Sequence, residues 1–299
     1  MKTVYALFSI CLLLLVACSE KEEKQTEASA ISQRETIAES RRANRLFDQF
    51  FLAQVARYPS LSAKFGLRNQ QDKLDNLSDV YAKQTLQLKQ KQLLSLNAID
   101  PDSLDKTTRL SLKLFKQTLK QDIGDFKWRF HSYPVNHMNG LHTAAIKLLS
   151  KHHTLHSVED ARDYIKRLKA VPRYLDQLTV GLTTRADLGI IMPSFAFPYV
   201  INDCLFITQG GILEDFRRKL NTTTIATSVR EALYAAASQA FTVELEPAYQ
   251  KFIVYLQRLQ KKTDSRAGVW TFPDGERFYK QVLERSTSTK LQPSEIHEI

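Results

Sequence analysis

The stretch SVEDARDYIKRLKAVPRYLDQL, residues 157–178, indicates the fold class of this chain. Its apolar residues recur every three or four positions, which is typical of an amphipathic helix. Ser157 and Asp160 resemble a capping box with Asp in place of the usual Glu or Gln, so the helix is expected to begin directly after Ser157. Pro172 is expected to kink this helix or to divide it from a second one.

The same spacing recurs on both sides of this stretch. One apolar stripe is predicted to end at Tyr58-Pro59, since the residue before a proline is pushed out of the helical region. A second stripe is predicted to end at Gly124. The two stripes consist of Leu46, Phe47, Phe50, Phe51 and Val55, and of Leu110, Leu114, Phe115, Leu119 and Ile123.

The carboxyl-terminal third carries three more helix starts. Ser228 and Glu231 match a capping box that opens a long periodic segment, which runs to about Lys262 with Pro247 inside it. Pro273 suits the first turn of another helix. Pro293-Ser294-Glu295 also has the form of a helix start, but only four residues follow it.

Composition supports the helical pattern. Glycine and proline occur only nine times each, and no segment alternates between apolar and polar residues, so collagen-like and turn-dense all-β chains are excluded. We therefore predict an all-α fold, an array of long kinked amphipathic helices. No repeat of fixed period is detectable.

The first residues predict the location of the protein. Lys2 precedes Val4–Ala17, which has no charged residue but is shorter than the about 20 apolar residues that span a bilayer. Leu15-Val16-Ala17-Cys18 resembles a bacterial lipobox, in which the cysteine is diacylated and becomes the mature amino terminus. The alternative is an ordinary secretory signal with a cysteine near its cleavage site. Ser19 favours sorting to the outer membrane.

This interpretation gives three segments. Residues 1–17 are a lipoprotein signal peptide, residues 18–38 are the lipidated Cys18 with a flexible polar tether, and residues 39–299 are a helical domain. The expected partner is the membrane, through the lipid on Cys18. Cys204 has no cysteine partner and is interpreted as a small buried residue.

The positive charge does not indicate a nucleic-acid partner. The formal net charge is +10, but the lysines are spread along helical faces without a nucleic-acid motif. We therefore expect no nucleic acid, whereas weak attraction to anionic lipid stays open. The sequence also contains no Gly-rich phosphate loop and no G-x-S-x-G elbow.

Histidine is the only chemically suggestive residue type. Six of the seven histidines fall within one segment, namely His131, His137, His142, His152, His153 and His156. No carboxylate or cysteine completes a zinc set at the usual spacing, so we interpret them as a polar loop with scattered surface histidines. A triple alanine substitution at the last three is then expected to leave folding intact. His297-Glu298 matches the start of H-E-x-x-H, but the second histidine is not in this chain.

Several blocks in order resemble the bacterial lipoprotein family called domain of unknown function 885. The resemblance covers residues 40–299. Its blocks are Tyr58-Pro59-Ser60, Phe65-Gly66-Leu67, Leu74-Asp75-Asn76-Leu77-Ser78, Gly140-Leu141, Leu148-Leu149, Ser157-Val158-Glu159-Asp160-Ala161, Tyr164-Ile165, Arg167-Leu168, Gly189-Ile190-Ile191-Met192-Pro193, Gly268-Val269-Trp270, Pro273-Asp274-Gly275-Glu276-Arg277-Phe278-Tyr279, Thr287-Ser288-Thr289 and Glu295-Ile296-His297-Glu298-Ile299.

Members of that family look like mainly helical zinc metallopeptidases acting on peptides. Their zinc motif lies downstream of the block that contains His297-Glu298, so the resemblance assigns no catalytic or metal residue to this chain and implies that the chain is an amino-terminal part. Trp270, Asp274, Gly275 and Tyr279 either line a cleft or shape a turn and cap a helix.

Two functions follow as expectations. The first is an outer-membrane lipoprotein that resembles the amino-terminal half of a zinc metallopeptidase and is inactive alone, with zinc only in full-length relatives. The second is a non-catalytic, lipid-tethered helical binding or scaffold protein. The sequence does not decide whether the chain is an enzyme.

Overall fold

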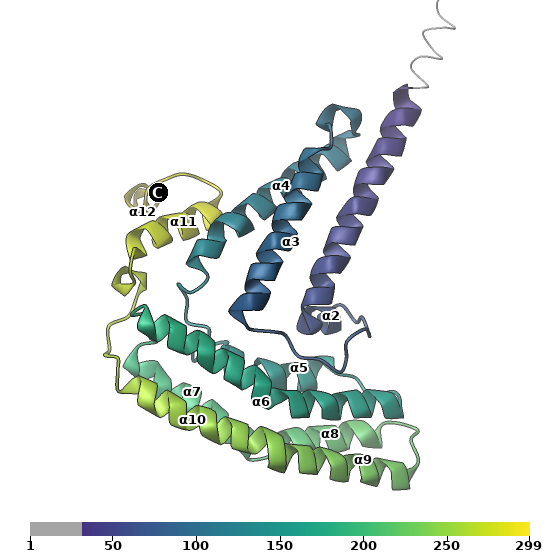
Figure 1. The fold of residues 1–299 in the computed structure, drawn as a ribbon, viewed down its shortest axis with the longest axis vertical. Helices are drawn as coiled ribbons and strands as arrows, with labels where there is room; N and C mark the ends of the chain where they lie inside the picture. Colours follow the sequence, from purple (N-terminus) through teal and green to yellow (C-terminus); the bar gives the residue numbers. More distant parts are fainter. Residues whose placement is uncertain (1–31) are drawn as a thin grey trace, which may run out of the picture. The chain divides into compact units, whose positions relative to one another are not determined.

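The structure is a computed structural model that describes residues 32–299, and this range consists of helices and connecting loops without a strand (Figure 1). The predicted all-α fold class is thereby confirmed. The predicted signal peptide and Cys18 lie outside the described residues. The first helix covers residues 32–57, so residues 32–38, which we expected in the tether, belong to it. Gln33, Arg34, Glu35 and Ala38 favour helix, which explains this extension.

The remaining elements follow in chain order, and most are α-helices. They are α2 (Pro59–Lys64), α3 (Asp79–Asn97), η1 (Pro101–Ser103), α4 (Lys106–Asp125), η2 (Phe126–Trp128), η3 (Leu141–Thr143), α5 (Ala144–His152), α6 (Val158–Asp187), η4 (Ser194–Ala196), α7 (Phe197–Thr208), α8 (Gly211–Asn221), α9 (Thr227–Ala240), η5 (Phe241–Leu245), α10 (Glu246–Gln260), η6 (Val269–Thr271), α11 (Gly275–Thr287) and α12 (Pro293–Glu298).

The described chain divides into two compact units. The smaller unit contains residues 32–51 and 90–120, and the larger unit contains residues 52–89 and 121–299. Each unit has its own apolar core.

The core of the smaller unit corrects the predicted face of α4. Leu112 and Leu119 are buried, and the ring of Phe115 meets the ring of Phe47 edge-on at 5.8 Å between centroids. Leu110 and Leu114, placed in the stripe by their spacing, are 56% and 54% exposed. Leucines occur on both sides of this helix, so spacing alone selects the wrong pair.

The larger unit is built around α6. Helix α10 packs along both α6 and α7, and α9 packs on α6 as well (Figure 1). The buried side chains of α6 are mainly apolar and include Tyr164, Leu168 and Leu175. This packing explains why the amphipathic stripe of residues 157–178 is stable as a helix.

The start of α6 agrees with the prediction. The Ser157 hydroxyl accepts a hydrogen bond from the Asp160 amide, and the Asp160 carboxylate accepts one from the Ser157 amide. Pro172, however, lies inside the single helix Val158–Asp187 and does not divide it. The buried residues on both sides of Pro172 hold the helix together against the loss of one backbone donor.

The long helical segment that contains Pro247 differs from the prediction at its start and before the proline. The helix starts at Thr227 with Ala226 as N-cap and no side-chain cap, so the capping box predicted at Ser228 is wrong. Ile225 packs against the core directly before this start, which sets the entry of the helix two residues earlier. A π-helical turn, Phe241–Leu245, precedes Pro247 and joins α9 to α10 (Figure 1).

The helix predicted to start at Pro273 begins instead at Gly275. Phe272 and Gly275 donate backbone hydrogen bonds to Val269 and Phe272, which closes residues 268–275 into a hook. A Cβ atom at Gly275 would lie 2.0 Å from the carbonyl oxygen of Val269. This hook therefore needs glycine at position 275 and occupies the residues that would form the first turn.

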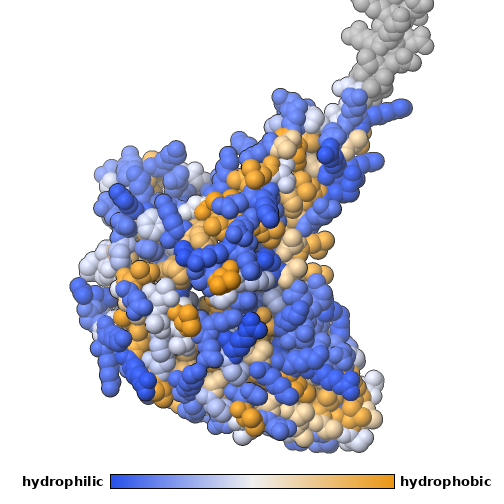
Figure 2. Space-filling view, viewed as in Figure 1, coloured by the Kyte–Doolittle hydropathy of each residue, from blue (hydrophilic) through white to orange (hydrophobic). Residues whose placement is uncertain are grey.

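The surface in view is mostly hydrophilic, with small apolar areas between the charged side chains (Figure 2). Among the described residues, no helix combines the length and the apolar character needed to cross a bilayer.

Candidate functional site

A fully buried arginine holds the segment between α2 and α3 on α6. Arg167 is 1% exposed, and its guanidinium donates hydrogen bonds to the carbonyl oxygens of Lys73 (2.9 Å) and Gln70 (3.2 Å). Its third hydrogen bond goes to Nδ1 of His153 at 2.8 Å. Burial lowers the pKa of Arg167 to about 10, so the side chain stays charged at neutral pH.

Asp160 is joined to this arrangement through its carbonyl oxygen, which lies 2.9 Å from Nε2 of His153. Its carboxylate accepts hydrogen bonds from the amides of His156 and Ser157, both at 2.9 Å, and pairs with Arg68. Burial alone would raise the pKa of Asp160, but these donors hold it below its usual range. Asp160 is thus engaged in holding the 153–157 turn.

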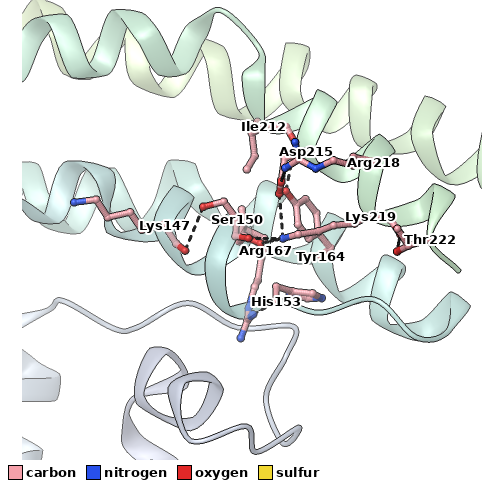
Figure 3. A network of polar contacts seen from close by, with 11 residues as sticks. Lys147, Ser150, His153, Tyr164, Arg167, Ile212, Asp215, Arg218, Lys219 and Thr222 are labelled. Atoms are coloured by element: carbon pink, nitrogen blue, oxygen red, sulfur yellow. Dashed lines mark hydrogen bonds and ion pairs between the residues drawn. The ribbon is translucent and has the colours of Figure 1, made fainter.

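A second, partly buried cation lies against the ring of Tyr164. The ammonium group of Lys219 donates to the carbonyl oxygens of Leu149 (2.6 Å) and Ser150 (2.7 Å) and pairs with Asp215 at 3.0 Å (Figure 3). Burial lowers the pKa of Lys219, whereas Asp215 opposes this shift. Lys219 therefore satisfies carbonyl groups at the end of α5, where a cation also complements the helix dipole.

Asp75 lies between two pockets of the larger unit. Its carboxylate accepts hydrogen bonds from the amide (2.9 Å) and the hydroxyl (2.5 Å) of Ser60 at the start of α2. Leu74, Asp75 and Tyr174 line both pockets. Because Ser60 occupies both oxygens of the carboxylate, Asp75 serves to position the loop before α3.

One of these pockets, which we call the α2–α5 pocket, combines an apolar floor with a basic rim. Its volume is about 430 Å³, within the range of small-molecule sites. The apolar lining includes Leu74, Leu141 and Leu148, and Asp75 is its one acidic lining residue. Its basic lining residues are Lys64, Lys147, Lys151 and His152.

The other pocket has a volume of about 380 Å³ and a mixed lining. Arg57 and Arg173 lie there together with Asp72 and Asp75. Arg57 is held by the hydroxyl of Thr85 and the carbonyl of Tyr81, and it lies over the Tyr81 ring. Lys73 is a third basic lining residue, so the two acids offset most of the positive charge in this pocket. The α2–α5 pocket has three lysines against one acid, and we take it as the candidate functional site.

The six clustered histidines do not form one group. His152 and His156 are exposed, as expected for surface residues. His142 and His153 are buried, so the interpretation of the whole set as surface histidines is wrong. His142 lies 3.2 Å from the Asp203 carboxylate, and His131 contacts the rings of Trp128 and Phe278.

Burial of His153 also changes the expected effect of substitution. Its ring is 1% exposed and hydrogen-bonded on both nitrogens, to Arg167 and to the carbonyl of Asp160. Alanine at this position would leave a buried guanidinium donor unpaired, so the triple alanine variant is expected to lose stability.

Trp270, Asp274, Gly275 and Tyr279 were expected to line a cleft or to shape a turn and cap a helix, and the contacts support a role in a turn for Gly275. Gly275 shapes the turn, as described above, but the Asp274 side chain makes no capping hydrogen bond. Trp270 and Tyr279 are exposed. His297 lies in the last turn of α12, a six-residue helix. Cys204 is buried, and burial raises the pKa of its thiol to about 12.

A zinc centre needs several ligating side chains close together. Between residues 32 and 299, no group of three or more His, Cys, Asp or Glu side chains lies close enough together to hold a metal ion. The described residues therefore do not fit a zinc centre, and we derive no step through one.

The burial of Arg167 was not predicted, although the sequence carries a signal for it. Arg167 lies three residues after Tyr164 and four before Val171, and therefore on the buried face of α6. A charged residue on such a face indicates a specific buried partner. No comparable signal exists for the α2–α5 pocket, because its lysines come from helices far apart in the chain.

The fold and the pocket define a class: an all-α protein built on a long central helix with a basic, partly apolar pocket beside it. The chain belongs to the family described as bacterial protein of unknown function (DUF885), whose model matches residues 59–299. The resemblance is thus shown from residue 59, at the start of α2, and not from residue 40.

Two solved structures share the fold. A putative lipoprotein from Colwellia psychrerythraea matches 87% of this chain with a TM-score of 0.76 at 17% identity. A putative lipoprotein of unknown function from Shewanella oneidensis matches 81% of this chain with a TM-score of 0.58 at 14% identity. The matches cover 48% and 42% of those two chains, so this chain spans less than half of their length. No curated protein matches.

Proposed function

We propose that this protein is a lipoprotein held at the outer membrane by a diacylated Cys18. The lipobox Leu15-Val16-Ala17-Cys18 carries the proposal, and Ser19 supports the outer membrane as its destination. The description of both structural relatives as putative lipoproteins agrees with it.

Substitution of Cys18 tests this anchor. Cys18→Ser is expected to abolish labelling by radioactive palmitate and to remove the protein from the outer-membrane fraction. Cys11→Ser is the matched control, because it removes a cysteine of the same leader and should leave both properties unchanged. Unchanged labelling of the Cys18→Ser protein would refute the anchor. Ser19→Asp is expected to shift the protein to the inner membrane.

The second part of the proposal concerns the helical domain. Residues 32–299 form the framework half of a peptidase-like family member, and the zinc ligands of such a protein lie outside this range. The support is the family and the share of the relatives' length that is covered.

Metal content and hydrolysis test this assignment. The purified chain is expected to hold no stoichiometric zinc after dialysis and to cleave no peptide from a mixed peptide library. His152→Ala/His156→Ala serves as control for weak metal binding, because both side chains are exposed and their removal spares the fold. One zinc per chain with hydrolysis, both lost in this double variant, would overturn the proposal.

A lipid-tethered binding protein is the second candidate function. The observation in its favour is the α2–α5 pocket, which combines a ligand-sized volume with apolar and basic lining residues. Saturable binding of a small ligand by a chain without hydrolytic activity would favour this candidate.

A further inference from the structure

The rim of the α2–α5 pocket carries positive charge that the described protein does not neutralise. Lys64, Lys147 and Lys151 line it, and none of them belongs to the ion pairs formed among the described residues. Lys147 donates one hydrogen bond, to the neutral Asn139 side chain at 3.2 Å. By contrast, Lys83, Lys89, Lys166, Lys219 and Lys251 each pair with an acid.

The acceptors near these lysines leave most of their positive charge unpaired, since the lining holds three lysines and one acid. Asp75 is bonded through both oxygens to Ser60. The carbonyl groups of Leu149 and Ser150 at the end of α5 are occupied by Lys219. In Figure 3 the Lys147 ammonium group points away from that buried network. The three ammonium groups are therefore available to a ligand.

The pocket also selects for an apolar portion of that ligand. Leu74, Leu141 and Leu148 line it together with the lysines. A free inorganic anion would leave this floor in contact with water, whereas an apolar group on the anion would cover it. Three lysines around one engaged carboxylate match a doubly charged anion better than a singly charged one.

We propose that the α2–α5 pocket binds a phosphate monoester that carries an apolar body. Lys64, Lys147 and Lys151 hold the phosphate, and the leucine floor holds the body. The phosphate belongs either to a soluble ester or to a phospholipid headgroup, which present the same group to the lysines. This site is independent of the peptidase-like assignment.

Calorimetric titration of the full chain in a neutral detergent tests the site with phenyl phosphate as probe. We expect one site per chain, with binding at least tenfold tighter than that of inorganic phosphate or benzoate. Inorganic phosphate lacks the apolar body, and benzoate carries only one charge. Benzoate binding as tightly as phenyl phosphate, or no saturable binding of phenyl phosphate, would overturn the proposal.

Matched charge variants distinguish binding of phenyl phosphate in the pocket from nonspecific attraction of the anion to a positively charged protein. Lys147→Gln/Lys151→Gln is expected to weaken phenyl phosphate binding at least tenfold, and Lys64→Gln gives an independent loss from α2. Lys113→Gln/Lys120→Gln on α4 removes the same charge from two exposed lysines and should change the affinity less than twofold. Equal losses in both double variants would refute a specific site. Circular dichroism checks that each variant keeps its helix content.

A competition experiment distinguishes the two sources of phosphate. Soluble dihexanoyl phosphatidic acid is added to the complex with phenyl phosphate. Displacement at equal or lower concentration assigns the site to a lipid headgroup, and retention of phenyl phosphate assigns it to soluble esters. Displacement by dihexanoyl phosphatidylcholine, which has no monoester phosphate, would contradict the proposal.

Discussion

The guanidinium of Arg167 donates a hydrogen bond to Nδ1 of His153, with 2.8 Å between the nitrogens. Because arginine can only donate, Nδ1 of His153 is the acceptor and carries no proton. The proton is then on Nε2, which donates to the carbonyl oxygen of Asp160 at 2.9 Å. This contact therefore fixes His153 as the neutral tautomer with its proton on Nε2. A protonated His153 would place a second positive charge next to Arg167.

Stability is expected to fall on mild acidification because of His153. Burial and the Arg167 charge lower its pKa from 6.5 to about 4 in the folded chain. The unfolded chain therefore binds a proton below pH 6.5 that the folded chain binds only near pH 4, and stability is lost across this window as the pH falls. The loss amounts to about 3 kcal/mol, measured by denaturant unfolding from pH 7 to pH 4.

His153→Gln isolates this contribution, because glutamine keeps a donor and an acceptor but does not titrate. Burial of His142 also lowers its pKa and acts in the same direction, so the wild-type slope contains both residues. The difference in slope between wild type and variant between pH 7 and pH 5 is the quantity of interest. Identical slopes would show that His153 does not titrate as described.

Gly275→Ala is expected to destabilise the hook at residues 268–275. The new Cβ would lie 2.0 Å from the Val269 carbonyl oxygen, so the backbone must move, at a cost of about 2 kcal/mol. Gly211→Ala is the matched control, because Gly211 also begins a helix and its Cβ would meet no atom within 4 Å. Thermal melts monitored by circular dichroism should separate the two variants. A Gly275→Ala melting temperature equal to that of Gly211→Ala would contradict the close approach.

Leu112→Ala and Leu114→Ala should differ strongly in α4. Leu112 is 2% exposed and lies in the core of the smaller unit, whereas Leu114 is more than half exposed. Removal of the buried side chain costs about 2–5 kcal/mol, and removal of the exposed one costs roughly 0.5 kcal/mol. Denaturant unfolding measures both. The reverse order would mean that the stripe expected from spacing is the buried one after all.

Cys204 is expected to resist alkylation in the folded chain. The thiol is buried, and its pKa of about 12 leaves almost no thiolate at pH 8. With Cys18→Ser and Cys11→Ser in place, iodoacetamide should modify the protein only at denaturant concentrations that unfold α7 and its neighbours. Mass spectrometry follows the reaction. Rapid modification without denaturant would show that Cys204 is accessible.

Local sequence signals predicted the fold where neighbours in the chain set the structure. The capping box at Ser157 and the helix end before Pro59 depend on residues within one turn, and both are present. The Ser228 start and the Pro273 start failed because contacts from outside the segment set them: Ile225 packs on the core, and Val269 approaches Gly275. Local pattern carries no information on such contacts.

The α2–α5 pocket could not be predicted either, because it also depends on contacts between segments far apart in the chain. Lys64 lies at the end of α2, while Lys147 and Lys151 follow one another on α5, and only the packing of α2 on α5 brings them to one pocket. For Arg167, the position on the buried face of α6 could be predicted from the sequence. Its partners could not, because they are carbonyl groups of a loop distant in the chain.

The attachment of that loop to Arg167 has a consequence for the order of folding. Lys73 precedes Arg167 by 94 residues, and the loop around it has no strand or helix of its own to satisfy its carbonyl groups. A newly made chain therefore exposes this segment until α6 has been synthesised and has formed. Closure of the contact joins ends separated by a long stretch of chain, which is entropically costly. The loop before α3 thus becomes ordered only after α6 has formed, although it is synthesised before α6.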